Sequence, residues 1–268
     1  MTAIALDATD RQELLERFLR YVRVDTQSDE NSTSSQSTEK QKNLAKLLAE
    51  ELRSLGCSDA VMDEWGYVYA TVPGNLPKGH KAVGKVPTIG LIAHVDTYHG
   101  TVGAGVKPLV IEAYGGGDIA LPGDSRQVIR MTDNPNLARC VGHTLVTSDG
   151  TTLLGADDKA GVAEIMTVVA WLAKHPEFHH GPVRVAFTTD EEVGRGTEHF
   201  DVAAFGAGYA YTLDGSDLAE IEDETFCADS AMVVIEGHDV HPGYAKDKLI
   251  NAVRVAAAII ERLPREFL

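Results

Sequence analysis

The sequence has few cysteines, and their placement excludes a disulfide-stabilised fold. There are three in 268 residues: Cys57, Cys140 and Cys227. They are odd in number, far apart and without the paired spacing of a metal-binding motif. We therefore expect reduced thiols in a cytoplasmic protein.

Basic residues and long apolar segments are also scarce. Lys and Arg number 24 against 40 Asp and Glu, a formal net charge of −16. This acidic balance argues against nucleic acid and anionic membranes as partners, but it is compatible with cation binding. No apolar run approaches the length that spans a bilayer. The polar stretch 9–13 interrupts any signal-peptide pattern, so we expect no membrane attachment and a cytoplasmic location.

The hydrophobic pattern predicts an α/β fold. Asp10 is the expected N-cap of the first helix, and Ser37 or Thr38 that of the second. Later segments follow the order strand, helix, strand, strand, with polar residues at each strand end, as in α/β sheet enzymes. The expected helices are 10–24, 38–55, 162–174 and 247–262, and the expected strands are 61–62, 67–72, 88–93, 183–189, 208–213 and 231–236.

Two regions differ in character from the sheet-forming part. Residues 98–149 are long and irregular, and a loop region of this length in a compact domain is usually functional or disordered. The pattern changes again after Glu224. We therefore expect two domains, 1–222 and 223–268.

The apolar run 88–93 is the expected central strand, and it leads directly into His94-Val95-Asp96. Its continuous apolar character predicts a strand that is covered on both faces. Residues two apart in a strand point to the same face, so His94 and Asp96 would leave one rigid element together. The end of such a strand is where α/β sheets place their ligands. The alternative is a salt-bridged pair at a strand end.

Acidic residues stand at three further strand or loop ends: Asp157 with Asp158, Glu191 with Glu192, and Asp214. Each has an ordinary alternative, respectively a helix N-cap with a first-turn acid, a solvated pair, and a turn residue. Converging carboxylates repel one another, however, unless cations lie between them. Imidazole with carboxylates and no thiolate suits zinc, cobalt or manganese, and two such metals could activate a bridging water for hydrolysis.

Five segments together resemble the di-zinc peptidases that include carboxypeptidase G, aminoacylase and peptidase T. In chain order they are His94-Val95-Asp96, Gly155 to Gly161, Thr189 to Gly194, Leu213-Asp214-Gly215 and Val240 to Gly243. The resemblance covers essentially the whole chain and is strongest to the peptidase T members, in residues 116–121 and 144–165. It implies a zinc-peptidase-like catalytic domain, with a mixed, mostly parallel sheet sandwiched by helices. Residues 223–268 would begin a smaller α+β lid or dimerisation domain.

The resemblance also implies a metal centre with two zinc ions, for which cobalt or manganese could substitute. His94 and Asp214 would bind the first ion and Glu192 the second, while Asp157 would bridge both. Asp158, beside the bridging residue, is not assigned as a ligand.

Three more residues have implied roles around that centre. Asp96 would hydrogen-bond to His94 and set its tautomer. Glu191 would be the general base that deprotonates the bridging water and later protonates the leaving amine. His241 would reach the substrate from the lid, in its own or the neighbouring subunit, and stabilise the oxyanion. The alternative for His241 is a surface histidine at a Pro-Gly turn.

One feature of the family is missing from the sequence. The second metal of the family has a final His ligand that follows the lid domain, and no histidine follows His241. The chain therefore resembles the first two-thirds of a peptidase T. We expect it to bind at most one zinc firmly, to aggregate readily and to hydrolyse little tripeptide. A full-length form would be a homodimer through the lid.

The leading hypothesis is a metal-dependent aminopeptidase that removes the N-terminal residue from tripeptides. Another metal-dependent amidase or carboxypeptidase of the same family would use the same metal centre. A third interpretation is a non-catalytic metal-binding fragment. Metal content and turnover on a tripeptide discriminate the third interpretation from the first.

Overall fold

The computed structural model describes residues 6–215, 220–224 and 231–264 of the chain. It divides into two compact units, Met1–Ala219 and Glu220–Leu268. Each unit is described by itself. The assignment of the first unit as the catalytic domain stays a prediction.

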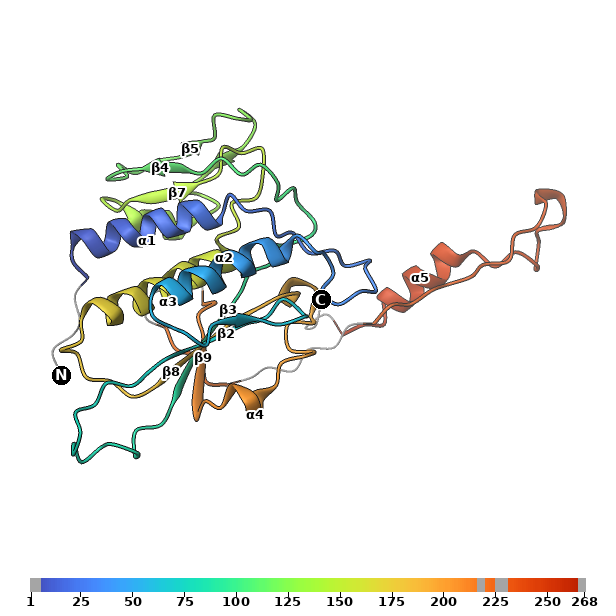
Figure 1. The fold of residues 1–268 in the computed structure, drawn as a ribbon. Helices are drawn as coiled ribbons and strands as arrows, with labels where there is room; N and C mark the ends of the chain where they lie inside the picture. The colour runs from blue at the N-terminus through green and yellow to red at the C-terminus, as the bar shows by residue number, and fades with distance from the viewer. Residues whose placement is uncertain (1–5, 216–219, 225–230, 265–268) are drawn as a thin grey trace. The chain divides into compact units, whose positions relative to one another are not determined.

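A five-stranded mixed sheet forms the centre of the first unit (Figure 1). Its strands lie in the order β1 (Val61–Met62), β2 (Val68–Val72), β8 (Val183–Thr188), β3 (Ile89–His94) and β9 (Tyr209–Thr212). β8, β3 and β9 are parallel, whereas β1 with β2 and β2 with β8 are antiparallel. The mixed, mostly parallel sheet is confirmed: of these five strands only β2 runs opposite to the other four.

Helices cover one face of this sheet. α2 (Gln41–Ser54) contacts β1 and β2, α3 (Ala156–Lys174) contacts β3, and α1 (Ala8–Tyr21) packs on α3 (Figure 1). The apolar side chains between them form the core, which includes Leu44, Leu48, Leu52, Val68, Ala93, Ile165, Met166, Val185 and Phe187. Burial of this apolar surface is the main stabilising contribution to the unit.

The opposite face is covered less than the apolar run 88–93 predicts. There the short helix α4 (Val202–Phe205) places the Phe205 ring against Tyr69 and Gly90. Ile89 is 38% exposed, and all four residues of β9 are exposed. Among the described residues, cover on this face is therefore only partial, because β9 is an edge strand and α4 is only four residues long.

Both predicted N-caps of the first two helices are wrong. Asp7 caps α1, and Asp10 lies inside the first turn, where its carboxylate accepts from the Asp7 backbone N–H in a capping box. α2 begins after Lys40 without any side-chain cap. The side chain of Ser37 is turned instead to a hydrogen bond with a residue 153 positions away, Asp190.

The irregular region 98–149 contains regular elements that its composition does not indicate. β4 (Leu109–Ile111) pairs with β7 (Leu145–Thr147), and β5 (Ile119–Ala120) pairs with β6 (Val128–Ile129). A 3-10 helix, η1 (Pro135–Cys140), lies between them. The strands are only two or three residues long, too short to form an alternating pattern that can be recognised in the sequence.

The second unit contains one helix of more than three residues among its described residues. This helix, α5 (Ala252–Ile260), is capped by the Asn251 side chain and is shorter than the predicted range 247–262. The turn at His241 is a 3-10 helix, η3 (Pro242–Tyr244), and residues 231–236 form no strand. Across the described ranges of both units, no helix is long and apolar enough to cross a membrane.

Candidate metal centre

His94 lies at the centre of a group of carboxylates, at the carboxyl end of β3. Its ring is buried, and its Nε2 atom lies 2.9 Å from an oxygen of Asp157. The same nitrogen lies 3.9 Å from an oxygen of Glu191 and 3.9 Å from an oxygen of Asp214. One imidazole nitrogen therefore faces three acidic side chains that are remote from one another in the sequence.

The sheet brings these residues together. β8, β3 and β9 run parallel, so their carboxyl ends meet at one edge. His94 is the last residue of β3, Glu191 follows β8 and Asp214 follows β9. Asp157 comes from the start of α3, the helix that packs on β3. The close packing of α3 depends on Gly161, because a Cβ there would lie 1.9 Å from the carbonyl oxygen of Leu213.

Asp96 links His94 to the turn that follows β8. One of its carboxylate oxygens lies 3.3 Å from Nδ1 of His94 and accepts the backbone N–H of Glu191 at 3.1 Å. The other oxygen accepts the backbone N–H of Glu192, also at 3.1 Å. Asp96 is fully buried, so this carboxylate orients the histidine and the turn from a position that solvent does not reach.

Asp158 follows Asp157 in the chain, and its side chain is buried. The peptide bond between the two residues is cis. The Asp158 oxygens accept the backbone N–H groups of His94 and Gly161. His94, Asp158 and Asp214 offer ligand atoms within 4.8 Å of one another. Because both Asp158 oxygens already accept backbone hydrogen bonds, we favour the more exposed Asp157 as the ligand from this pair.

The pKa values of His94, Glu192 and Asp214 are all raised, which favours extra positive charge in this cluster. Burial raises the pKa of Glu192 to about 6, and the charge of Asp157 adds to this shift. Burial likewise raises the pKa of Asp214 to about 6. Burial alone lowers the pKa of His94, but hydrogen bonds to Asp157 and Asp96 outweigh it and raise that pKa to about 11. Carboxylates that hold a proton on a buried imidazole also suit a cation at the same place, so the donor set fits a divalent metal.

Most of the residues that the sequence predicted for this site lie together. His94, Asp96, Asp157, Glu191 and Asp214 are joined by the contacts above, and Glu192 interacts with them through its backbone and its charge. His241 belongs to the second unit, where its ring accepts from the Gly243 backbone N–H. Its role at the metal centre stays a prediction.

Three neighbours of the site were missed by the sequence analysis: Ser37, Gln41 and Asp190. Asp190 directly precedes the Glu191-Glu192 pair, which was its only sequence signal. Ser37 and Gln41 gave none, because their contacts with Asp190 span about 150 residues.

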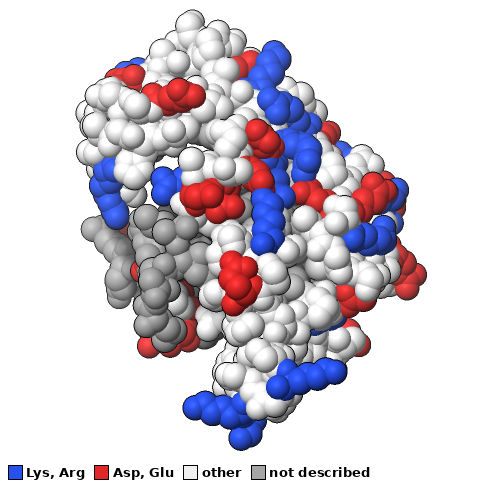
Figure 2. Space-filling view, turned by 60° about the vertical axis from the view of Figure 1, so that its left-hand side comes forward, with Lys and Arg blue, Asp and Glu red and all other residues white. Residues whose placement is uncertain are grey.

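Acidic and basic side chains are mixed on the surface. On the face drawn in Figure 2, acidic and basic side chains are interspersed and do not form one broad basic surface. The net charge of the chain is −16. That the chain does not bind nucleic acid stays a prediction.

The fold and the site define an α/β protein with a candidate metal centre at the carboxyl edge of its sheet. A family described as the peptidase dimerisation domain matches residues 224–267. Peptidase T of Geobacillus thermodenitrificans is 53% identical over 254 residues, and peptidase T of Bacillus pumilus is 52% identical over 256. The chain is therefore similar to these peptidase T sequences over most of its own length, as its motifs predict.

Solved structures support the fold. Aminopeptidase PepT from Bacillus cereus matches 95% of this chain with a TM-score of 0.58 at 24% identity. A tripeptidase from Staphylococcus aureus matches 94% with a TM-score of 0.61, also at 24% identity. These two structures are longer than the chain, which covers 57% and 56% of them. The matches to the two peptidase T sequences cover 95% and 96% of this chain. The chain spans only 60% and 61% of the length of those relatives.

Proposed function

We propose that this chain is part of a metal-dependent aminopeptidase that removes the N-terminal residue from tripeptides. The observation that carries the proposal is the convergence of Asp157, Glu191 and Asp214 on Nε2 of His94. It comes together with at least 50% identity to proteins named peptidase T over most of the chain. As part of the same proposal, we place the enzyme in the cytoplasm and its dimer contact in residues 223–268.

The side chains that would hold the metal are His94, Asp157, Glu192 and Asp214. We propose two zinc ions, with Asp157 shared between them, and cobalt or manganese as substitutes. Bound there, such ions would polarise the scissile carbonyl and lower the pKa of the attacking water. Asp96 would keep the His94 ring oriented through Nδ1, which leaves Nε2 free to face the metal.

Glu191 would do the proton transfer. Its carboxylate is half exposed and its backbone is held by Asp96, so it can reach both the solvent side and the site. In the proposed reaction it takes a proton from the attacking water and returns it to the leaving amine. His241 would donate to the oxyanion that forms on the scissile carbonyl.

Three blocked and unblocked peptides test the proposal on the zinc-loaded enzyme of which we propose this chain is a part. An aminopeptidase should release alanine from trialanine and from trialanine amide, but not from N-acetyl-trialanine, because it requires the free amino terminus. A carboxypeptidase would instead cleave the acetylated peptide and reject the amide. Zinc binding without cleavage of any of the three would contradict the proposal and favour a non-catalytic metal-binding role.

A further inference from the structure

Asp190 carries a buried carboxylate for which the proposed chemistry has no use. It is 2% exposed and adopts a left-handed backbone conformation, with φ of 61°, in the turn after β8, which ends at Thr188. The nearest cationic group in its ion pairs, Nη2 of Arg195, lies 3.8 Å away. A buried charge is costly unless it is hydrogen-bonded, so the groups around this carboxylate have a definite task.

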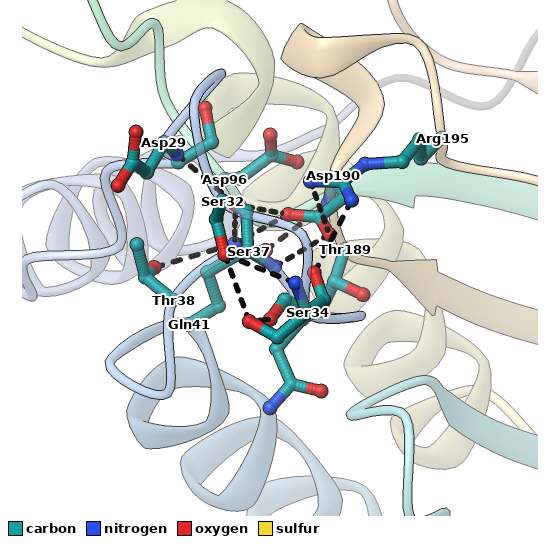
Figure 3. A network of polar contacts seen from close by, with 12 residues as sticks. Asp29, Ser32, Ser34, Ser37, Thr38, Gln41, Asp96, Thr189, Asp190 and Arg195 are labelled. Carbon is teal, nitrogen blue, oxygen red and sulfur yellow. Dashed lines mark hydrogen bonds and ion pairs between the residues drawn. The ribbon is translucent and has the colours of Figure 1, made fainter.

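Ser37 and Gln41 hold the Asp190 carboxylate (Figure 3). The backbone N–H and the hydroxyl of Ser37 donate to it at 2.6 and 2.5 Å. The side-chain amide of Gln41 donates at 2.7 Å, and its oxygen accepts the backbone N–H of Asp190 at 3.1 Å. Three donors thus point at one carboxylate, and all of them come from the start of α2 and the segment before it.

The same segment is attached to the end of β3. The hydroxyl of Ser28 donates to the carbonyl oxygen of Thr97 at 3.0 Å, and the Asp29 backbone N–H donates to the hydroxyl of Ser37 at 3.0 Å. Ser28, Ser37 and Thr97 are all buried. The segment therefore connects the strand end that carries His94 with the residue that precedes Glu191.

The turn at Glu191 and Glu192 consequently has two anchors. Asp96 accepts both of its backbone N–H groups, and the residue before it is held by Ser37 and Gln41. If the hydrogen bonds from Ser37 and Gln41 are removed, the Asp190 carboxylate is left buried without donors. The carboxylate would then move toward water and displace the Glu191-Glu192 turn.

We propose that Ser37, Gln41 and Asp190 form a positioning network that keeps the Glu191-Glu192 turn aligned with His94. This inference rests on the proposed function, because that function places the general base Glu191 and the metal ligand Glu192 in this turn. The network residues act through the turn and do not touch substrate. Displacement of reacting groups by about 1 Å can reduce a rate by about 100-fold, so a positioning effect is measurable even if the fold is intact.

The test compares Ser37→Ala and Gln41→Met with Thr167→Val in the zinc-loaded protein. Thr167 is an equally buried hydroxyl residue in α3 whose Oγ1 donates to the Ala163 carbonyl at 2.8 Å and accepts from Nη1 of Arg17 at 3.4 Å, so its substitution also removes the hydrogen bonds of a buried hydroxyl. On trialanine, the two network variants should lower kcat by roughly 10- to 100-fold with little change in KM. Thr167→Val should lower the thermal midpoint to a similar extent and leave kcat unchanged.

Amide hydrogen exchange gives a readout that needs neither zinc nor activity. In Ser37→Ala, the backbone amides of Glu191 and Glu192 should exchange faster than in Thr167→Val. Asp190→Asn should give the largest effect, because the N–H₂ of the new amide would face the donor groups of Ser37 and Gln41. If Asp190→Asn does not fold, the other two network variants still decide.

The outcomes separate this inference from the proposed function. If the unsubstituted protein binds zinc but cleaves no tripeptide, the proposed function fails, and the exchange rates of the two amides still test the network. If those rates and kcat respond to Ser37→Ala no more than to Thr167→Val, the network has no positioning role and the inference is overturned.

Discussion

At the scale of single residues, the candidate site depends on one buried imidazole that several acids share. The Asp157 contact and the Asp96 contact use different nitrogens of His94, so one ring joins a more exposed acid to a buried one. The carboxylates that face it have different environments: Asp96 is fully buried, whereas the side chain of Glu191 is 54% exposed. This difference is the physical basis for assigning orientation to Asp96 and proton transfer to Glu191.

The first prediction concerns the proposed base. Glu191→Gln keeps the shape of the side chain and removes its basicity, so turnover of trialanine should fall by at least about 100-fold while bound zinc is retained. Asp157→Ala is the contrasting variant and should lose zinc, because Asp157 would serve both ions. Metal analysis and kcat together separate the two effects. Unchanged turnover in Glu191→Gln would move the role of base to another residue.

The second prediction concerns Cys57, which is 2% exposed in the core. Burial raises the pKa of its thiol to about 11, with a further contribution from Asp59. The folded pKa lies above the ordinary value of about 9, so the stability gained from the neutral thiol is complete below pH 9. It is lost as the pH rises through about 11.

Two measurements check the behaviour of Cys57. At pH 8 its labelling by iodoacetamide, followed by peptide mass spectrometry, should be slower than that of the less buried Cys140. In Cys57→Ala, the thermal unfolding midpoint should fall less between pH 9 and pH 11 than in the unsubstituted protein. Labelling of both thiols at the same rate in the folded protein would contradict the prediction.

At the scale of elements, the site depends on how closely α3 approaches β9. A Cβ at position 161 would lie 1.9 Å from the carbonyl oxygen of Leu213 and 2.5 Å from an oxygen of Asp158. The first of these atoms is backbone and cannot move without the chain that carries Asp214. Close packing here is therefore a requirement of the metal centre as well as of the core.

The third prediction follows from this approach. Gly161→Ala should destabilise the protein by about 1–3 kcal/mol, as overpacking usually does, and should also weaken zinc binding by displacing Asp214. Gly215→Ala is the matched control, because a Cβ there meets nothing within 4 Å. Chemical denaturation and zinc titration of both variants provide the comparison. Equal zinc affinity in the two would show that the position of Asp214 does not depend on α3.

At the scale of the whole molecule, the second unit presents an apolar helix surface. In α5, Val253 is 76% exposed and Ile260 is 58% exposed. Apolar surface of this kind on a helix marks a contact site. The match of residues 224–267 to a peptidase dimerisation domain is consistent with a second copy of the chain as the partner.

The fourth prediction is that the chain self-associates through α5. Val253→Asp and Ile260→Asp should shift the distribution toward monomer, because each places a charge on the apolar surface. Val202→Asp is the control, since Val202 is 72% exposed but lies in the first unit. Sedimentation velocity over a range of concentrations measures the shift. The same shift in all three variants would place the contact outside α5.

The candidate site could be predicted from sequence because its signals are local. Apolar runs end at His94, before Glu191 and before Asp214, and a strand end can be recognised from its own few residues. Parallel neighbours then bring such ends to the same edge without further information. The resemblance to a peptidase family added the expected roles of individual residues, and the resemblance itself is confirmed by the relatives named above.

The sequence by itself thus determined the resemblance to a peptidase family, the mixed α/β sheet and the acids that follow its strands. The tertiary structure alone decided which side chains hold those acids in place. Ser37 is expected to cap a helix from its local sequence, yet it donates to Asp190, 153 residues further along the chain. A hydroxyl can satisfy its hydrogen bonds in either way, and only the folded chain, which buries a carboxylate next to it, makes the second arrangement the more stable one.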